Sequence, residues 1–112
     1  MIDIAAEWLT VPDVAERLDV PVTRVRQFLR DGALLATRID GVLRIPADFI
    51  GDGVIVKGLQ GTITLLRDAG HDDEEALRWL YAADDSLPGT PIQALAENRG
   101  TEVKRRAQAS AL

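Results

Sequence analysis

The side chains best suited to specific recognition lie between residues 22 and 44, where arginines outnumber acidic residues. A helix predicted over residues 22–31 carries Thr23, Arg24, Gln27 and Arg30 on one side and Arg26 at the margin of that side. Arginine and glutamine can form two hydrogen bonds at once with the edges of guanine and adenine, respectively. The spacing therefore predicts a helix that reads base pairs in the major groove of DNA.

Two short helices joined by a tight turn would position these side chains. The first, over residues 11–18, has apolar residues at the spacing of one buried stripe: Val11, Val14, Ala15 and Leu18. Thr10 suits its N-cap, with Asp13 three positions later. Pro21 precedes the second helix, whose apolar residues fall within about a third of its circumference: Val22, Val25, Phe28 and Leu29. We expect Val25 and Phe28 to anchor the second helix to the first.

A two-stranded wing is predicted directly after Gly32, which suits the end of the second helix. Residues 34–39 and 42–45 flank Asp40-Gly41, a strong signal for a two-residue hairpin turn. The hairpin carries Arg38 and Arg44. In a winged helix, such arginines reach phosphates or the minor groove beside the recognition helix.

Residues 9–50 resemble the excisionase and MerR-type winged helix-turn-helix, in which a hairpin is followed by Ile-Pro and a short helix (LTVPDVAERLDVPVTRVRQFLRDGALLATRIDGVLRIPADFI). Nearly the whole chain, including KGLQGTITLLRDAGHDDEEALRWL and VKRRAQA, resembles an actinobacterial family of winged-helix DNA-binding proteins whose mycobacterial member is a serine/threonine kinase substrate. This resemblance implies a helical C-terminal region, double-stranded DNA as a partner and a link to a serine/threonine kinase. The sequence begins almost at the first helix, without a long polar N-terminal tail, so phosphorylation of such a tail does not carry over.

The rest of the chain is predicted to be mostly helical. Residues 46–50 suggest a helical turn that packs Phe49 and Ile50 under the hairpin, and residues 54–57 a third strand beside the wing. Helices are expected over residues 59–69 and from Asp72, as a hairpin, then over residues 92–98, closed by Gly100, and from Thr101 towards Leu112. The predicted fold class is mainly α with a small β-hairpin: a winged helix-turn-helix DNA-binding domain over residues 1–57 and a helical C-terminal region over residues 58–112.

The overall charge does not favour nucleic-acid binding. The 112 residues carry a formal net charge of −5, whereas DNA-binding domains are usually basic. The charge is uneven, however, because residues 17–44 hold six arginines against three aspartates, a net charge of +3. Phosphates respond mainly to charges within a Debye length, roughly 10 Å at 0.1 M salt, so the acidic remainder is partly screened.

Several classes of protein are disfavoured by composition. The chain has no cysteine, which excludes disulfides and thiolate metal sites. The single histidine, His71, is expected in a surface loop with no second nitrogen ligand, so we predict no metal and no cofactor. No arrangement of a nucleophile with a base or of paired carboxylates indicates an enzyme. Without an apolar run of about 20 residues or a signal peptide, no membrane partner is expected and the location should be cytoplasmic.

Alternative interpretations remain for several features. Trp79 is expected in the core rather than in a base-stacking platform. The run Lys104-Arg105-Arg106 suits either a second phosphate contact or the negative end of a helix dipole. The leading function is DNA binding, as a transcriptional regulator or an architectural factor, and a homodimer would form through the C-terminal helices. The alternatives are a protein-interaction module, as in an antitoxin or adaptor, and an excisionase-like recombination accessory factor.

Overall fold

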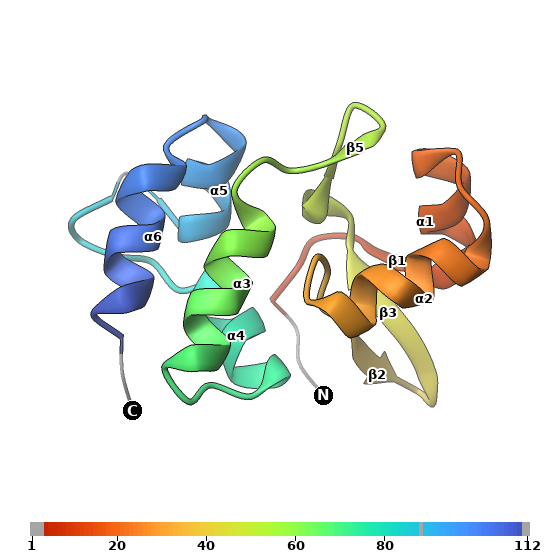
Figure 1. Cartoon of the computed structure of the whole chain (residues 1–112), viewed down its shortest axis with the longest axis horizontal. Coiled ribbons are helices and arrows are strands. Elements are labelled where there is room, and N and C mark those ends of the chain that lie inside the picture. Colours follow the sequence, from red (N-terminus) through yellow and green to blue (C-terminus); the bar gives the residue numbers. More distant parts are fainter. Residues whose placement is uncertain (1–3, 88, 111–112) are drawn as a thin grey trace.

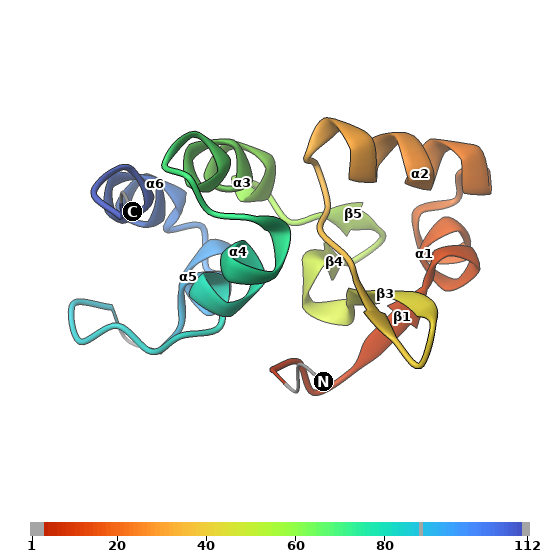
Figure 2. The same cartoon turned by 90° about the horizontal axis from the view of Figure 1, so that it is seen from below.

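Two groups of helices lie side by side along the longest axis of the protein, with small sheets beneath the N-terminal group (Figures 1 and 2). The computed structural model describes residues 4–87 and 89–110, and its principal extents are 36 × 27 × 24 Å. The fold is mainly helical, with a winged helix-turn-helix followed by a helical C-terminal region, as predicted. No helix within the described ranges is long and apolar enough to cross a membrane.

Helices α1 (Val11–Leu18) and α2 (Val22–Asp31) begin and end where the sequence predicts. Thr10 caps α1 as half of a capping box: its hydroxyl accepts from the Asp13 amide, and its own amide donates to the Asp13 carboxylate. Asp19 ends α1 in the left-handed conformation, φ 57°, and Gly32 ends α2 at φ 75°. These caps fix the tight link that holds α2 across α1.

The wing consists of β2 (Thr37–Ile39) and β3 (Val42–Pro46), antiparallel about the predicted turn at Asp40-Gly41. Both turn residues have positive φ, 52° and 80°, as a type I′ turn requires. The first strand is shorter than predicted, because Leu34 and Leu35 lie in the buried core between α2 and the wing instead of extending it. Phe49, in the 3-10 turn η1 (Ala47–Phe49), and Ile50 are buried as expected.

The third strand of the wing sheet is β1 (Trp8–Thr10), which pairs antiparallel with β3, Leu9 opposite Ile45. The prediction that residues 54–57 fill this place is wrong. Residues Val54–Ile55 form β5, which pairs with β4 (Ile50–Gly51) in a separate two-stranded sheet. The reason is a second Asp-Gly turn, at Asp52 and Gly53 with φ 50° and 80°, which folds the chain straight back on itself.

The C-terminal region contains four helices: α3 (Leu59–Asp68), α4 (Asp73–Leu80), α5 (Pro91–Ala96) and α6 (Gly100–Gln108). Helix α4 follows α3 after a short turn, but α3 packs most extensively along α6. Gly100 was predicted to close α5 and instead begins α6, because Asn98 makes the left-handed turn at φ 63°. The last helix was predicted to run towards Leu112, but α6 ends at Gln108 and Ala109 caps it, two residues before the described range ends.

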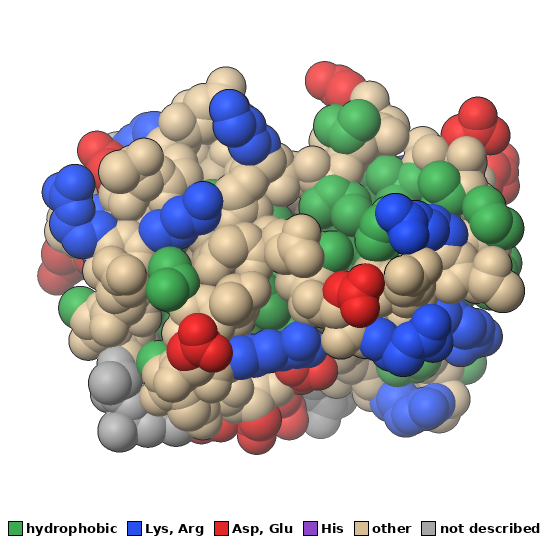
Figure 3. Space-filling view, in the orientation of Figure 1, with side chains coloured by type: hydrophobic (Ala, Val, Ile, Leu, Met, Phe, Trp, Pro, Cys, Tyr) green, Lys and Arg blue, Asp and Glu red, His purple; other side chains and the backbone are tan. Residues whose placement is uncertain are grey.

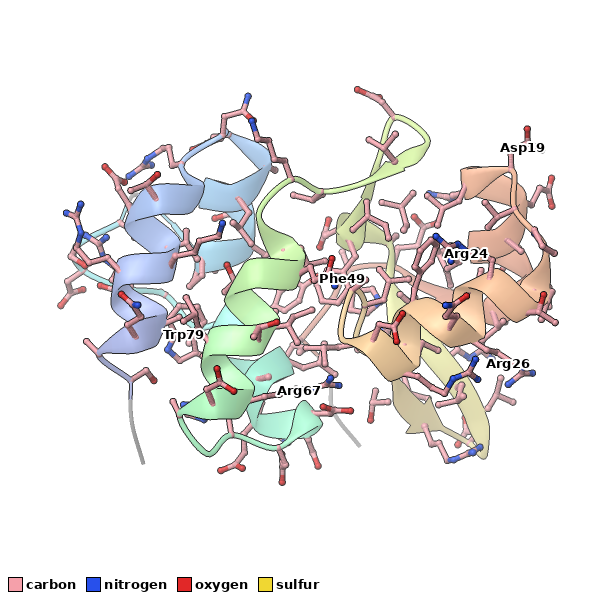
Figure 4. All side chains as sticks on the ribbon, in the orientation of Figure 1. Asp19, Arg24, Arg26, Phe49, Arg67 and Trp79 are labelled. Carbon is pink, nitrogen blue, oxygen red and sulfur yellow. The ribbon has the colours of Figure 1, made fainter. Side chains whose placement is uncertain are left out.

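The buried residues of both halves form one apolar cluster rather than two separate cores. Phe49, fully buried, lies where the halves meet (Figure 4). The hydroxyl of the half-buried Tyr81 donates to Asp48 at 2.8 Å, and partial burial together with this bond raises the pKa of Tyr81. Trp79 is half-buried against the cluster, consistent with the predicted core role. The C-terminal helices therefore pack beside the helix-turn-helix half through a shared core.

His71 lies in the turn between α3 and α4, as predicted, but it is more than a solvated loop residue. It is half-buried, and its Nε2 lies 2.8 Å from the carbonyl oxygen of Ser110, to which it donates. This bond joins the turn to the end of α6. Within the described ranges, no group of three His, Cys, Asp or Glu side chains could hold a metal ion.

Candidate nucleic-acid interface

The outer surface of α2 presents the predicted polar side chains together. Thr23, Arg24, Arg26, Gln27 and Arg30 are all exposed. The opposite side is less buried than predicted, because only Val25 is fully enclosed, Phe28 is half-buried, and Val22 is 37% exposed beside the turn that links the two helices. Val25 anchors α2 as expected, whereas Phe28 lies at the edge of the core.

Arg24 is held along the helix by two neighbours. Its Nη1 donates to the Gln27 side-chain oxygen at 2.9 Å, and its guanidinium lies 4.7 Å from the centre of the Phe28 ring. The two side chains predicted to read bases are therefore bonded to each other. A base edge would have to replace this hydrogen bond between Arg24 and Gln27. The bond is exposed, so water already competes for the same donor and acceptor.

Arg24 and Arg26 leave α2 on opposite sides (Figure 4). Arg26 points towards the wing, where it lines an open groove with Arg38, Val42 and Leu43. Arg24 points the other way, towards the junction with the C-terminal helices, and lines a different hollow. Thr23, Gln27 and Arg30 lie between them on the helical circle, so α2 has a central polar strip with one arginine at each margin.

The two wing arginines do not lie on the same face. Arg38 pairs across the hairpin with Leu43, whereas Arg44 pairs with Thr37 on one side and Thr10 on the other. Successive residues of a strand point to opposite faces, so Arg38 faces the α2 side and Arg44 faces away. Arg38 is exposed and donates to the Gly41 carbonyl at 3.2 Å, while Arg44 is half-buried. The structure therefore brings Arg38 to the α2 surface and leaves Arg44 apart.

Arg44 lies near the capping box that begins α1. The Thr10 backbone and side chain, hydrogen-bonded to Asp13, hold the pKa of that carboxyl below its usual range, and the charges of Arg17 and Arg44 add to the effect. The contribution of Arg44 is the smallest of these.

The arginines of α2 and the wing share one electrostatic property. Among the residues that the structure describes, none of these five has a carboxylate within 4.0 Å, whereas five other arginines do: Arg17, Arg67, Arg78, Arg99 and Arg106. Lys and Arg side chains gather over α2 and the wing in Figure 3, and others lie on the same face over α3 and α6. This surface is basic although the whole chain is acidic.

The structure separates the members of the Lys104-Arg105-Arg106 run. Arg106 donates to the Ser86 hydroxyl and to the Glu102 carbonyl, so it fastens the loop before α5 to α6. Arg105 is exposed, and Lys104 lies against the first turn of α3. Sequence reasoning left these three equivalent, because which side of α6 meets α3 depends on long-range packing.

Comparison with known proteins covers both halves. Residues 1–50 match a family described as "DNA-binding protein Rv2175c, wHTH domain", and residues 56–111 match "Rv2175c C-terminal domain of unknown function". The chain is 43% identical over 114 aligned positions to DNA-binding protein Rv2175c of Mycobacterium tuberculosis, covering 90% of this chain and 78% of that protein. Over 52 positions it is 38% identical to an excisionase of Streptomyces ambofaciens, covering 46% of this chain and 84% of the excisionase.

The same relationship appears in three dimensions. An NMR structure of Rv2175c superposes with a TM-score of 0.89 at 39% sequence identity, covering all of this chain and 86% of that one. Both the helix-turn-helix half and the helical half are therefore shared, and the chain belongs to the Rv2175c family.

Proposed function

We propose that this protein binds double-stranded DNA, with α2 in the major groove and the wing against the adjacent backbone. The observation that carries the proposal is the basic surface of α2 and the wing, where every arginine lacks a carboxylate partner among the described residues. These guanidinium groups can bind phosphate oxygens and base edges without breaking an existing ion pair. The name of the M. tuberculosis relative, a DNA-binding protein, supports the same function.

Within this surface we assign different roles by position. Arg24 and Gln27 would contact bases, with Thr23 beside them, because they lie in the first part of α2, which enters the groove deepest in helix-turn-helix proteins. Arg26, Arg30 and Arg38 lie at the wing margin or later on the helix and would contact phosphates. We expect Arg44 to contribute least, because it is on the other face of the wing sheet.

We further propose that residues 1–57 supply the DNA-binding domain and residues 58–112 a helical support for it, in a transcriptional regulator or an architectural factor. A dimer through the C-terminal helices has little to support it. The exposed large apolar side chains of the described residues are Val22, Val42 and Val54, all in the N-terminal half. Stable homodimer interfaces are usually rich in apolar area, so we propose that a single copy binds each site.

Selection of bound fragments from random duplex DNA tests this proposal. We expect enrichment of one short sequence without two-fold symmetry, bound at one protein per duplex. A palindromic sequence would instead show that two copies bind, which would favour the homodimer. An excisionase-like role would appear as enrichment of recombination sites when genomic fragments are used.

Titrations of the selected duplex and a scrambled one, at several salt concentrations, test the individual roles. Arg24→Ala should reduce discrimination between the duplexes, whereas Arg38→Ala should weaken both alike and lower the salt slope by about one. If the parent protein and both variants bind neither duplex, the protein-interaction module is the better account of this surface.

A further inference from the structure

A second hollow lies on the side of α2 away from the wing, where the two halves of the protein meet. This junction groove has a volume of about 460 Å³ and is lined by residues of α2, β5, α3 and α6, among them Arg24, Phe28, Asp31, Gly61 and Lys104. It shares Gly58 and Lys104 with an adjacent hollow of about 320 Å³, which Lys57 also lines. One recessed surface thus runs from the recognition helix to the C-terminal half.

Lys104 can line this surface because α3 has a glycine beneath it. A Cβ placed on Gly61 would lie 2.7 Å from Lys104 Cε and 3.1 Å from its Nζ. The Lys104 side chain therefore lies across the first turn of α3 and lines both hollows. Arg105, the next residue of α6, is also exposed and lines neither of them.

The charge of the recessed surface is positive. Arg24, Lys57 and Lys104 have no carboxylate within 4.0 Å among the described residues. The acidic residue that lines the junction groove is Asp31, at the end of α2. The surface therefore suits an anionic ligand, and its two adjoining hollows suit a chain of charges better than a single ion.

The position of the junction groove beside α2 indicates the identity of this anionic ligand. Helix α2 has the groove of Arg26 and Arg38 at one margin and the junction groove at the other. A helix in the major groove, which is about 12 Å wide, has a sugar-phosphate strand on each side of it. Helices α2, α3 and α6 lie along the same side of the protein (Figure 2), so a duplex on α2 also faces the C-terminal helices.

We propose that the junction groove binds the second sugar-phosphate strand of the duplex, with Lys57 and Lys104 contacting its phosphates. This inference rests on the proposed DNA binding and extends it to the C-terminal half, so that the two halves hold the two strands of one major groove. Because phosphate contacts carry no base information directly, this half adds affinity rather than sequence preference.

The test compares Lys104→Ala with Arg105→Ala in the full chain. Each removes one positive charge from the same helix, so a general effect of net charge would weaken DNA binding equally in both. Affinity for a mixed-sequence duplex of about 20 base pairs is measured at several salt concentrations. We expect Lys104→Ala to lower the salt slope by about 0.9 and the affinity at 0.1 M salt roughly eightfold, as for one lost phosphate contact, and Arg105→Ala to keep the parental slope.

Three further variants sharpen the result, with thermal melts to verify that each is folded. Lys57→Ala should behave like Lys104→Ala. Gly61→Ala keeps every charge but displaces the Lys104 side chain, so it should also weaken binding. Asp31→Asn removes the acidic group from the groove and should strengthen binding.

The outcomes are distinguishable. Equal losses in Lys104→Ala and Arg105→Ala would overturn the groove contact in favour of a diffuse charge effect. If neither variant changes the slope while Arg30→Ala lowers it, DNA binding stands and the second strand does not reach the C-terminal half. If the parent protein binds no duplex, the proposed function fails, and this inference fails with it.

Discussion

Arginines serve different purposes in the two halves of this protein. Of the five arginines in the C-terminal half, Arg67, Arg78, Arg99 and Arg106 each lie within 4.0 Å of a carboxylate and Arg105 does not, whereas on α2 and the wing no arginine does so among the described residues. An exposed ion pair contributes about 0–1 kcal/mol, so leaving an arginine unpaired sacrifices little stability. The position of clustered unpaired cations, rather than net charge, therefore indicates the surface for an anionic partner.

The largest expected effect is a loss of stability at the place where the two halves meet, and it tests whether the halves unfold together. Phe49→Ala should reduce the free energy of unfolding by ~3–5 kcal/mol, because the ring is fully enclosed where the halves meet. Thermal unfolding followed by circular dichroism and by Trp fluorescence should still give one transition, since both halves share one cluster. Two separate transitions would mean that the halves unfold independently.

Phe28→Ala is the matched control in the N-terminal half. From sequence, Phe28 was expected to be a buried anchor of α2. Because its ring is half-buried and covered on one face by the Arg24 guanidinium, we now expect a loss of only about 1–2 kcal/mol. A loss as large as that of Phe49→Ala would restore the sequence-based prediction.

Removing Arg24 or Gln27 should affect discrimination between DNA sequences. Each single alanine variant is expected to lose about 1–3 kcal/mol of preference for the selected duplex over a scrambled one. The two side chains are bonded to each other at 2.9 Å, so the double variant should lose less than the sum of the single losses. Additive losses would indicate that Arg24 and Gln27 read the duplex independently.

Arg30→Ala and Arg78→Ala compare the unpaired and the paired arginines directly. Both residues are exposed in the last turn of a helix, but Arg78 donates to Glu74 at 3.0 Å. We expect Arg30→Ala to weaken duplex binding roughly eightfold at 0.1 M salt without changing stability. Arg78→Ala should leave binding unchanged and cost about 0.3–0.5 kcal/mol of stability. The reverse pattern would refute the distinction between the two halves.

The smallest effect concerns acid stability. The pKa of Asp13 is lowered in the folded protein by its hydrogen bonds to Thr10, so this carboxylate stabilises the fold above its ordinary pKa of 3.8. That contribution is lost as the pH falls through the lowered value. Thr10→Ala should weaken the acid-dependent change of unfolding free energy, measured by denaturant titration between pH 6 and about pH 2. The Thr10 backbone bond to Asp13 remains in this variant, so an unchanged profile would mean that the hydroxyl half of the capping box does not contribute.

Local signals allowed most of the N-terminal half to be predicted from sequence. Caps and turn residues mark α1, α2 and the wing, because each acts within a few residues of the chain. Strand β1 was missed because three residues directly before a helix are too short to show alternation. The Asp52-Gly53 turn carried the same signal as Asp40-Gly41, but residues 54–57 were expected to pair with the wing rather than with the strand just before that turn.

The arrangement of the site was less predictable than its composition. The sequence indicated which arginines would cluster, but not that Arg38 and Arg44 point to opposite faces, since that depends on the pairing with β1. Arg24 and Lys104 line the same groove although they are 80 positions apart, and the sequence has no local signal for such long-range packing.

The shared core also determines how the role of the C-terminal half can be studied. A truncated chain ending at residue 57 would expose to water the apolar surface that α3 now covers, and we expect such a fragment to aggregate rather than to act as an isolated domain. Its failure to bind DNA would then reflect poor solubility and not the loss of a contact. Genetic deletion would be misleading for the same reason, so single surface substitutions are the informative tools for this protein.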